Sequence, residues 1–268
     1  MALLDDFLIR SLFAGILMVL LAAPMGCLMV WQRLAFLADT LGHASVLGVA
    51  LGLIMQLHPI VGVLVVILVI MLIVRQTAGQ PLALSESVLA IISHTGLAAG
   101  ILLLSVSGAT HISLEAILFG DLLATSMVDL GFILVTVVIL LALLLRYWRD
   151  FVAYSVSPEI SQAEGISVKR LQLILYLMIA LLIAVMMKVM GVLLIGAMLV
   201  IPVNAARVFS RGPEQMLLLS LLFGLASLAG GMFFSWHLDL QTGPAIVVMA
   251  AVWLLLSLLT DKLIKALT

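Results

Sequence analysis

The sequence predicts an all-α, polytopic membrane protein, and three observations support this fold class. Of the 268 residues, 65% are hydrophobic and only 9% are charged, whereas an ordinary soluble domain has about a quarter charged residues. Apolar runs of about twenty residues, the length of a transmembrane helix, recur along the whole chain. Basic residues mark every second connection between these runs. We therefore expect one transmembrane domain over residues 1–268.

Nine apolar runs are candidate transmembrane helices. They occupy residues 10–31, 36–57, 59–75, 86–107, 128–147, 171–188, 190–209, 215–235 and 243–262. The run 190–209 follows so closely on its predecessor that a broken or re-entrant helix stays open as an alternative. The prediction is thus eight or nine transmembrane helices.

The sides of the membrane follow from the distribution of Lys and Arg. Basic residues flank alternate connections, which the positive-inside rule places in the cytoplasm: Arg33, Arg75, Arg146, Arg149, Lys169, Arg170, Arg207, Arg211, Lys262 and Lys265. Lys188 is the exception, because it falls in an outer connection. The connection 107–124 has an apolar stretch too short to span, so we expect it to lie in or dip into the outer face.

The connection from Arg149 to Arg170 is the only extended polar segment on the cytoplasmic side. Ser157 followed by Pro158 is a helix-start signal, and Gly165 is a plausible stop. A short amphipathic helix on the cytoplasmic face is therefore predicted, and such a helix can receive another protein. A simple connector between two spans is the alternative.

Asp39 and His43 stand four residues apart inside an apolar run. Placing an ionisable side chain in hydrocarbon costs several kcal/mol, about 3 on insertion scales. Such a pair is therefore expected to have a specific structural or functional role. On a helix the two side chains project from one face, which lets a carboxylate oxygen and an imidazole nitrogen reach one cation. The alternative is an Asp–His hydrogen-bonded pair that joins two helices without metal.

His94 lies within the candidate span 86–107. Gly96 and Gly100 allow close approach of another helix, which could bring His94 against Asp39 and His43. Asp, His and His form a nitrogen and oxygen set suited to zinc, whereas manganese tolerates a shell richer in oxygen. A lone histidine bonded to a carbonyl or hydroxyl group is the competing interpretation.

Several functions are disfavoured because their motifs are missing from the sequence. The chain contains no Gly-x-x-x-x-Gly-Lys-Ser/Thr phosphate loop and no His-Glu-x-x-His, so neither ATP hydrolysis by that loop nor a zinc protease is indicated. There is no basic field for nucleic acid. On the outer side His111 and Glu115 repeat the four-residue spacing, although a solvated surface is the more ordinary role for such a pair.

Six segments together resemble the membrane subunits of metal-importing ABC transporters, the family that takes up zinc, manganese and sometimes ferrous iron. They run in order along nearly the whole chain: 33–48, 118–124, 157–165, 199–206, 213–216 and 242–245. Most of them are similar to the zinc-importer permease of Gram-negative bacteria in particular. Two positions depart from the family pattern, since Gly42 stands where Ser is frequent and Leu47 where many members have Pro.

The resemblance implies a transport permease in the bacterial inner membrane and not an enzyme. Its cargo would be Zn²⁺, with Mn²⁺ as the alternative, and no cofactor would be permanently bound. Two copies would form a homodimer within membrane lipid, with cytoplasmic ABC ATPase subunits and a periplasmic metal-binding protein as partners.

Site residues also follow from the resemblance. Asp39, His43 and His94 would contact the metal. A coupling helix within 155–168 would dock on the ATPase through Ser157, Pro158, Glu159, Ala163, Glu164 and Gly165, and the binding protein would meet His111, Glu115 and Asp239.

Three other functions stay open at this point. A manganese or iron importer permease of the same family fits the same motifs. A proton-coupled secondary transporter predicts similar halves with paired broken helices, and no convincing internal repeat is seen. An intramembrane hydrolase needs a nucleophile or activated water beside a general base. The segment 157–165 separates these classes, because only an ABC permease requires a docking helix there.

Overall fold

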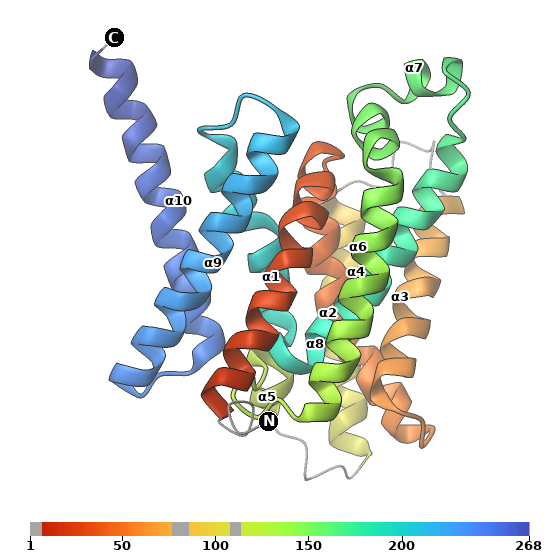
Figure 1. The fold of residues 1–268 in the computed structure, drawn as a ribbon. Helices are drawn as coiled ribbons and strands as arrows, with labels where there is room; N and C mark the ends of the chain where they lie inside the picture. The colour runs from red at the N-terminus through yellow and green to blue at the C-terminus, as the bar shows by residue number, and fades with distance from the viewer. Residues whose placement is uncertain (1–6, 77–85, 108–113, 268) are drawn as a thin grey trace.

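The computed structural model describes residues 7–76, 86–107 and 114–267, and these residues form ten helices and no strand (Figure 1). In chain order the helices are α1 (Phe7–Trp31), α2 (Ala35–Ile54), α3 (Pro59–Gln76), α4 (Glu86–Val106), α5 (Leu114–Phe119), α6 (Met127–Val156), α7 (Pro158–Ala163), α8 (Val168–Arg207), α9 (Pro213–Leu238) and α10 (Thr242–Leu267). The predicted all-α class is confirmed.

Seven of the described helices are long and apolar enough to cross a membrane, namely α1, α2, α4, α6, α8, α9 and α10. The helix α3 has a shorter apolar stretch, Pro59–Val74. Each of the nine predicted runs coincides with one of these helices, but the runs 171–188 and 190–209 both fall in α8. The count is therefore eight spans if α8 crosses the membrane once and nine if it crosses twice.

The helix α8 reverses direction at Gly191, whose backbone is non-helical with φ 72° and ψ 167°. A straight helix of 40 residues would be about 60 Å long, twice the thickness of the hydrocarbon core. Both ends of α8 nevertheless lie at one face. Val168 closely follows α7, and Arg207 lines a cavity with Ser155, which closely precedes α7. The broken helix, which the sequence left open as an alternative, is therefore present in the structure.

Glycine is required at this reversal because two backbones touch there. Gly120, which directly follows α5, has φ 72°, and a Cβ atom on it would lie 2.5 Å from the backbone nitrogen of Gly191. A Cβ atom on Gly191 would in turn overlap the backbone of Phe119 and Gly120. The short outer helix α5 is thus held against the break in α8.

Replacing Gly191 by Ala should destabilise the protein, by roughly 1–3 kcal/mol from the positive φ alone and by more from the clash with Gly120. A lower melting temperature of the purified protein in detergent would report this. Gly131→Ala in α6 is the matched control, because nothing lies within 4 Å of its Cβ position. Equal melting of the two variants would contradict this account.

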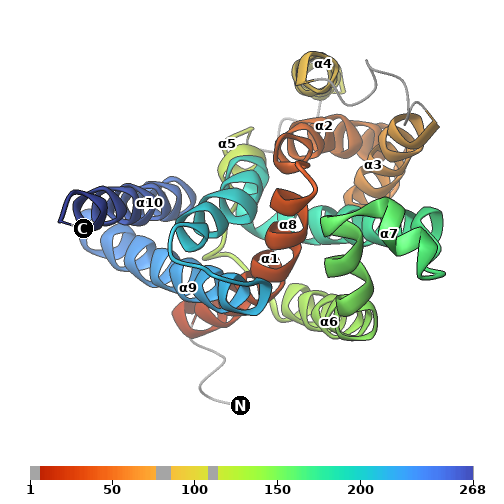
Figure 2. The ribbon, with the colours of Figure 1, turned by 90° about the horizontal axis from the view of Figure 1, so that it is seen from above.

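The helices α1 and α8 occupy the middle of the bundle, as the view from above shows (Figure 2). The helices α2, α3 and α4 lie on one side, α9 and α10 on another, and α6 with α7 on a third. The helix α4 is at the edge, where α2 is its main neighbour. The predicted close approach is confirmed, since a Cβ atom on Gly96 would lie 3.0 Å from Ala44 Cα.

The two faces of the bundle agree with the distribution of basic residues. The helix α7 and the basic end of α10 lie at one face, and α5 lies at the other (Figure 1). Lys188, the exception to the charge rule, forms an ion pair with Asp129 at the start of α6. Asp129 also accepts a hydrogen bond from the hydroxyl of Ser126, at 2.6 Å. A paired lysine explains the exception.

The predicted cytoplasmic connection begins at residue 149, but in the structure α6 continues as a helix to Val156. Tertiary packing extends it beyond the apolar run. Phe151 is fully buried, and the hydroxyl of Tyr154 accepts a hydrogen bond of 2.8 Å from Gln172 near the start of α8. The connection proper is therefore confined to α7 and its flanking residues.

Candidate functional site

Asp39 and His43 lie one turn apart on α2, with 3.5 Å between Asp39 Oδ2 and His43 Nδ1. The predicted sharing of one helix face is therefore present. The Asp39 side chain is 45% exposed and that of His43 is 16% exposed. The pair thus combines one largely enclosed imidazole with one accessible carboxylate.

Ser93 on α4 contacts the imidazole of His43 across the interface between α2 and α4. Its hydroxyl oxygen is 2.8 Å from His43 Nδ1, so this nitrogen faces both Ser93 and the carboxylate of Asp39. A neighbouring carboxylate favours the tautomer with the proton on Nδ1, which leaves the lone pair of Nε2 as a donor. Metal-binding histidines are commonly oriented in this way.

The second half of α8 covers Asp39. A Cβ atom on Gly196 would lie 3.2 Å from Asp39 Oδ1, and a Cβ atom on Gly42 would lie 3.3 Å from the carbonyl oxygen of Val192. The reversal at Gly191 therefore places a small residue beside the carboxylate. Three helices, α2, α4 and α8, build the surroundings of the pair.

His94 does not join this pair in the structure. Its side chain is exposed, whereas Ser93, Gly96 and Gly100 are buried on the face of α4 that meets α2. Successive residues on a helix are separated by about 100°, so His94 points away when Ser93 points in. The close helix approach occurs as expected, but it brings Ser93 to His43. Across the described residues, no three His, Cys, Asp or Glu side chains gather in one place.

The predicted cytoplasmic helix is present as α7. Ser157 is its N-cap, and its hydroxyl accepts a hydrogen bond of 3.3 Å from the backbone N–H of Ile160. Pro158 is the first residue of the helix, and Gly165 follows it with φ 84°. The predicted start and stop signals are confirmed, although the helix itself is limited to Pro158–Ala163.

The surface of α7 is open to solvent. Most of its predicted docking residues are exposed, namely Pro158, Glu159, Ala163, Glu164 and Gly165, and the apolar side chain of Ile160 is 61% exposed. The pKa of Glu159 is lowered because its own backbone N–H and the Ser157 hydroxyl donate hydrogen bonds to its carboxylate. This carboxylate therefore stays ionised at neutral pH.

The predicted outer contacts are spread over two places. Glu115 on α5 is exposed, and Asp239 is exposed at the end of α9 with φ 51°. His111 lies outside the described residues. Asp121 is exposed, with Oδ1 accepting a hydrogen bond from the backbone of Ala124, whereas Asp129 is buried in its ion pair.

Sequence reasoning missed two residues of the site, Ser93 and Gly196. Ser93 carried a weak signal, because it is a polar residue inside an apolar run and directly precedes His94. Gly196 carried none, since its proximity to Asp39 depends on the reversal of α8.

Comparisons with known proteins give matches to membrane proteins of metal transport systems over nearly the whole chain. The profile of the ABC 3 transport family matches residues 4–261. A relative from Haemophilus influenzae, the high-affinity zinc uptake system membrane protein ZnuB, is 35% identical, with 94% of this chain and 97% of the relative aligned. The manganese import system permease protein ScaB of Streptococcus gordonii is 27% identical over 94% of this chain and 90% of its own.

A solved structure has the same fold. The structure of PsaBC from Streptococcus pneumoniae in complex with Fab superposes with a TM-score of 0.85 and 27% identity, covering 95% of this chain and 92% of that chain. The family match spans nearly every residue, and the membrane helices, the broken α8 and the exposed α7 are all present. This chain belongs to the ABC 3 transport family.

Proposed function

We propose that this chain is the membrane permease of an ABC importer that moves a divalent transition metal, most readily Zn²⁺, into the bacterial cytoplasm. One observation carries the assignment to a metal. A carboxylate and an imidazole lie together on α2, with 3.5 Å between Asp39 Oδ2 and His43 Nδ1, in a chain of this family. The zinc uptake relatives, 35% and 36% identical over more than 90% of the chain, support zinc.

In this proposal His43 offers Nε2 to the passing ion, and the accessible Asp39 carboxylate turns from His43 Nδ1 to offer an oxygen. Water or a further residue completes the shell, so that the ion is bound weakly enough to be released. Ser93 acts through His43, because it keeps Nδ1 engaged and so presents Nε2.

Manganese is the second candidate cargo. Relatives named for manganese transport or import are 26–27% identical to this chain over more than 90% of its length. An imidazole suits zinc, while manganese prefers oxygen ligands, so the His43 donor favours zinc between the two. Parallel uptake of radiolabelled zinc and manganese, in a strain lacking its own zinc importer, tests the choice. Zinc uptake should exceed manganese uptake, and the reverse result would reassign the cargo.

The energy for transport would come from a separate ABC ATPase that receives α7. Its exposure, with an apolar Ile160 at the surface, supports a docking role. We further propose a homodimer of this chain in the inner membrane and a periplasmic metal-binding protein that contacts the outer face through Glu115, Asp239 and His111. Zinc uptake that continues without the ATPase subunit would instead favour a proton-coupled secondary transporter.

His94 as a third metal ligand stays a prediction. It requires a state in which α4 is turned about its axis by about one residue, or 100°, from the position seen here. We expect His94→Ala to lower the ratio of zinc uptake to manganese uptake, because zinc loses more when an imidazole is removed. Equal loss of both metals would indicate a packing role, and full activity at an unchanged ratio would remove His94 from the site.

A further inference from the structure

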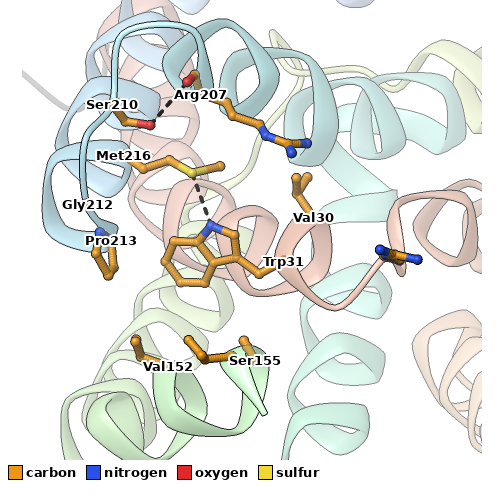
Figure 3. A pocket seen from close by; sticks show the side chains of 11 residues that line it. Val30, Trp31, Val152, Ser155, Arg207, Ser210, Gly212, Pro213 and Met216 are labelled. Carbon is orange, nitrogen blue, oxygen red and sulfur yellow. Dashed lines mark hydrogen bonds between the residues drawn. The ribbon is translucent and has the colours of Figure 1, made fainter.

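A cavity of about 580 Å³ opens at the cytoplasmic end of the bundle, away from Asp39 and His43. It lies between the end of α1, the end of α6, the end of α8 and the start of α9 (Figure 3). Trp31, Ser155, Arg207 and Pro213 represent these four elements in its lining. Its lining includes Ser155 and Val156 at the start of the predicted coupling segment 155–168, but Arg33, Arg207 and the start of α9 have no part in the metal-transport proposal.

The cavity has a net positive lining. Arg33 and Arg207 both line it, and no Asp or Glu is among its described lining residues. Neither guanidinium forms an ion pair with a carboxylate of the described chain, where the pairs are Asp39 with His43, Asp129 with Lys188 and Asp261 with Lys265. Planar guanidinium groups match the geometry of phosphate oxygens.

The start of α9 adds to the positive potential. Gly212 is the N-cap of this 26-residue helix and provides no side-chain cap, and both Gly212 and Pro213 line the cavity. The unpaired N–H groups at a helix N-terminus carry partial positive charge, which favours an anion beside them. Glu214 in the first turn of α9 is exposed and does not line the cavity, so inside the cavity the helix end and the two arginines act in the same direction.

Residues around the cavity are of the kind found at the level of lipid headgroups. Trp31 and Trp148 pack with their ring centroids 6.1 Å apart, and tryptophan is enriched at the membrane–water interface. The indole N–H of Trp31 points to the sulfur of Met216 at 3.1 Å (Figure 3). Val156 at the rim is an apolar side chain that is 81% exposed. Basic cavities between transmembrane helices on the cytoplasmic side suit anionic headgroups.

We propose that this cavity binds the phosphate headgroup of an anionic phospholipid from the cytoplasmic leaflet. Arg33 and Arg207 hold the phosphate oxygens, and the start of α9 stabilises the negative charge. The acyl chains leave past the apolar rim. The inference is independent of the metal, because the site lies at the cytoplasmic face and can be tested without transport.

The test compares Gly212→Asp with Gly212→Asn. The backbone at Gly212 is extended, with φ −166°, and nothing lies within 4 Å of its Cβ position, so both side chains fit. Both can cap α9, but only Asp brings a negative charge to the cavity. Binding of phosphatidylglycerol to the purified full-length permease in detergent is measured by native mass spectrometry, with phosphatidylcholine as the neutral reference.

We expect the wild type and Gly212→Asn to prefer phosphatidylglycerol, and Gly212→Asp to bind it about fivefold more weakly. The double variant Arg33→Gln/Arg207→Gln should lose roughly tenfold or more. Lys169→Gln/Lys262→Gln removes two exposed charges elsewhere on the same face and should bind normally.

Three results would overturn the proposal. Equal weakening in the Lys169/Lys262 control would indicate attraction to the basic face as a whole. Inorganic phosphate that binds as tightly as phosphatidylglycerol would indicate a site for the free anion. Displacement of lipid by the ATPase subunit, with loss of that complex in the Arg33/Arg207 variant, would assign the arginines to an acidic segment of the partner.

Discussion

Asp39→Asn and His43→Ala permeases should insert and assemble normally but lose zinc uptake. Each variant removes one of the two candidate metal-binding side chains of α2, in which Asp39 Oδ2 and His43 Nδ1 lie 3.5 Å apart. Mutation of residues that merely orient metal ligands costs about 10–100-fold, so loss of a donor should reduce uptake by roughly 100-fold or more. Radiolabelled zinc uptake, normalised to the amount of permease in the membrane, measures the effect.

Ser93→Ala should reduce zinc uptake less than these two variants do. It removes the hydroxyl 2.8 Å from His43 Nδ1 but leaves both donors in place, so we expect a loss of about tenfold. Normal uptake by the Asp39 and His43 variants would refute the site. Loss of assembly would instead mean that Asp39, His43 and Ser93 serve to join α2 to α4, the alternative that the sequence left open.

Substitution of Gly165 by Val should uncouple ATP hydrolysis from transport. Gly165 has φ 84°, which a β-branched residue adopts only with strain of about 1–3 kcal/mol, so the end of α7 should move relative to the ATPase. Gly165→Asn is the matched control, because Asn tolerates a positive φ and no atom lies within 4 Å of the Cβ position. Reconstituted complexes are assayed for ATPase activity and zinc transport together.

Glu164→Arg probes the same contact by charge. The side chain is exposed at the end of α7, so the change should leave the permease folded while altering the surface offered to the ATPase. We expect ATP hydrolysis that no longer drives uptake. Coupled transport at the wild-type rate in both Gly165→Val and Glu164→Arg would show that α7 is a connector and not a docking helix.

Local patterns in the sequence determined the helices, the alternation of basic residues between the two faces of the bundle and the short helix α7. Apolar runs of membrane length and the Ser157, Pro158 and Gly165 signals act over a few residues, and the structure contains each of them. The spacing of Asp39 and His43 is equally local, because four residues make about one helical turn. Partition into lipid and backbone hydrogen bonding both depend on composition within one segment, which a single sequence displays directly.

Only the tertiary structure decided what surrounds that pair. The reversal of α8 at Gly191 depends on the backbone of Gly120, 71 residues earlier, and it is this reversal that places Gly196 beside Asp39. The rotation of α4 likewise depends on how Gly96 and Gly100 seat against α2, which turns Ser93 toward His43 and His94 to the surface. Packing between helices sets these rotations. Ser93 shares the i, i+3, i+7 spacing of one helix face with Gly96 and Gly100, but only the packing shows that this face of α4 meets α2 and brings Ser93 to His43.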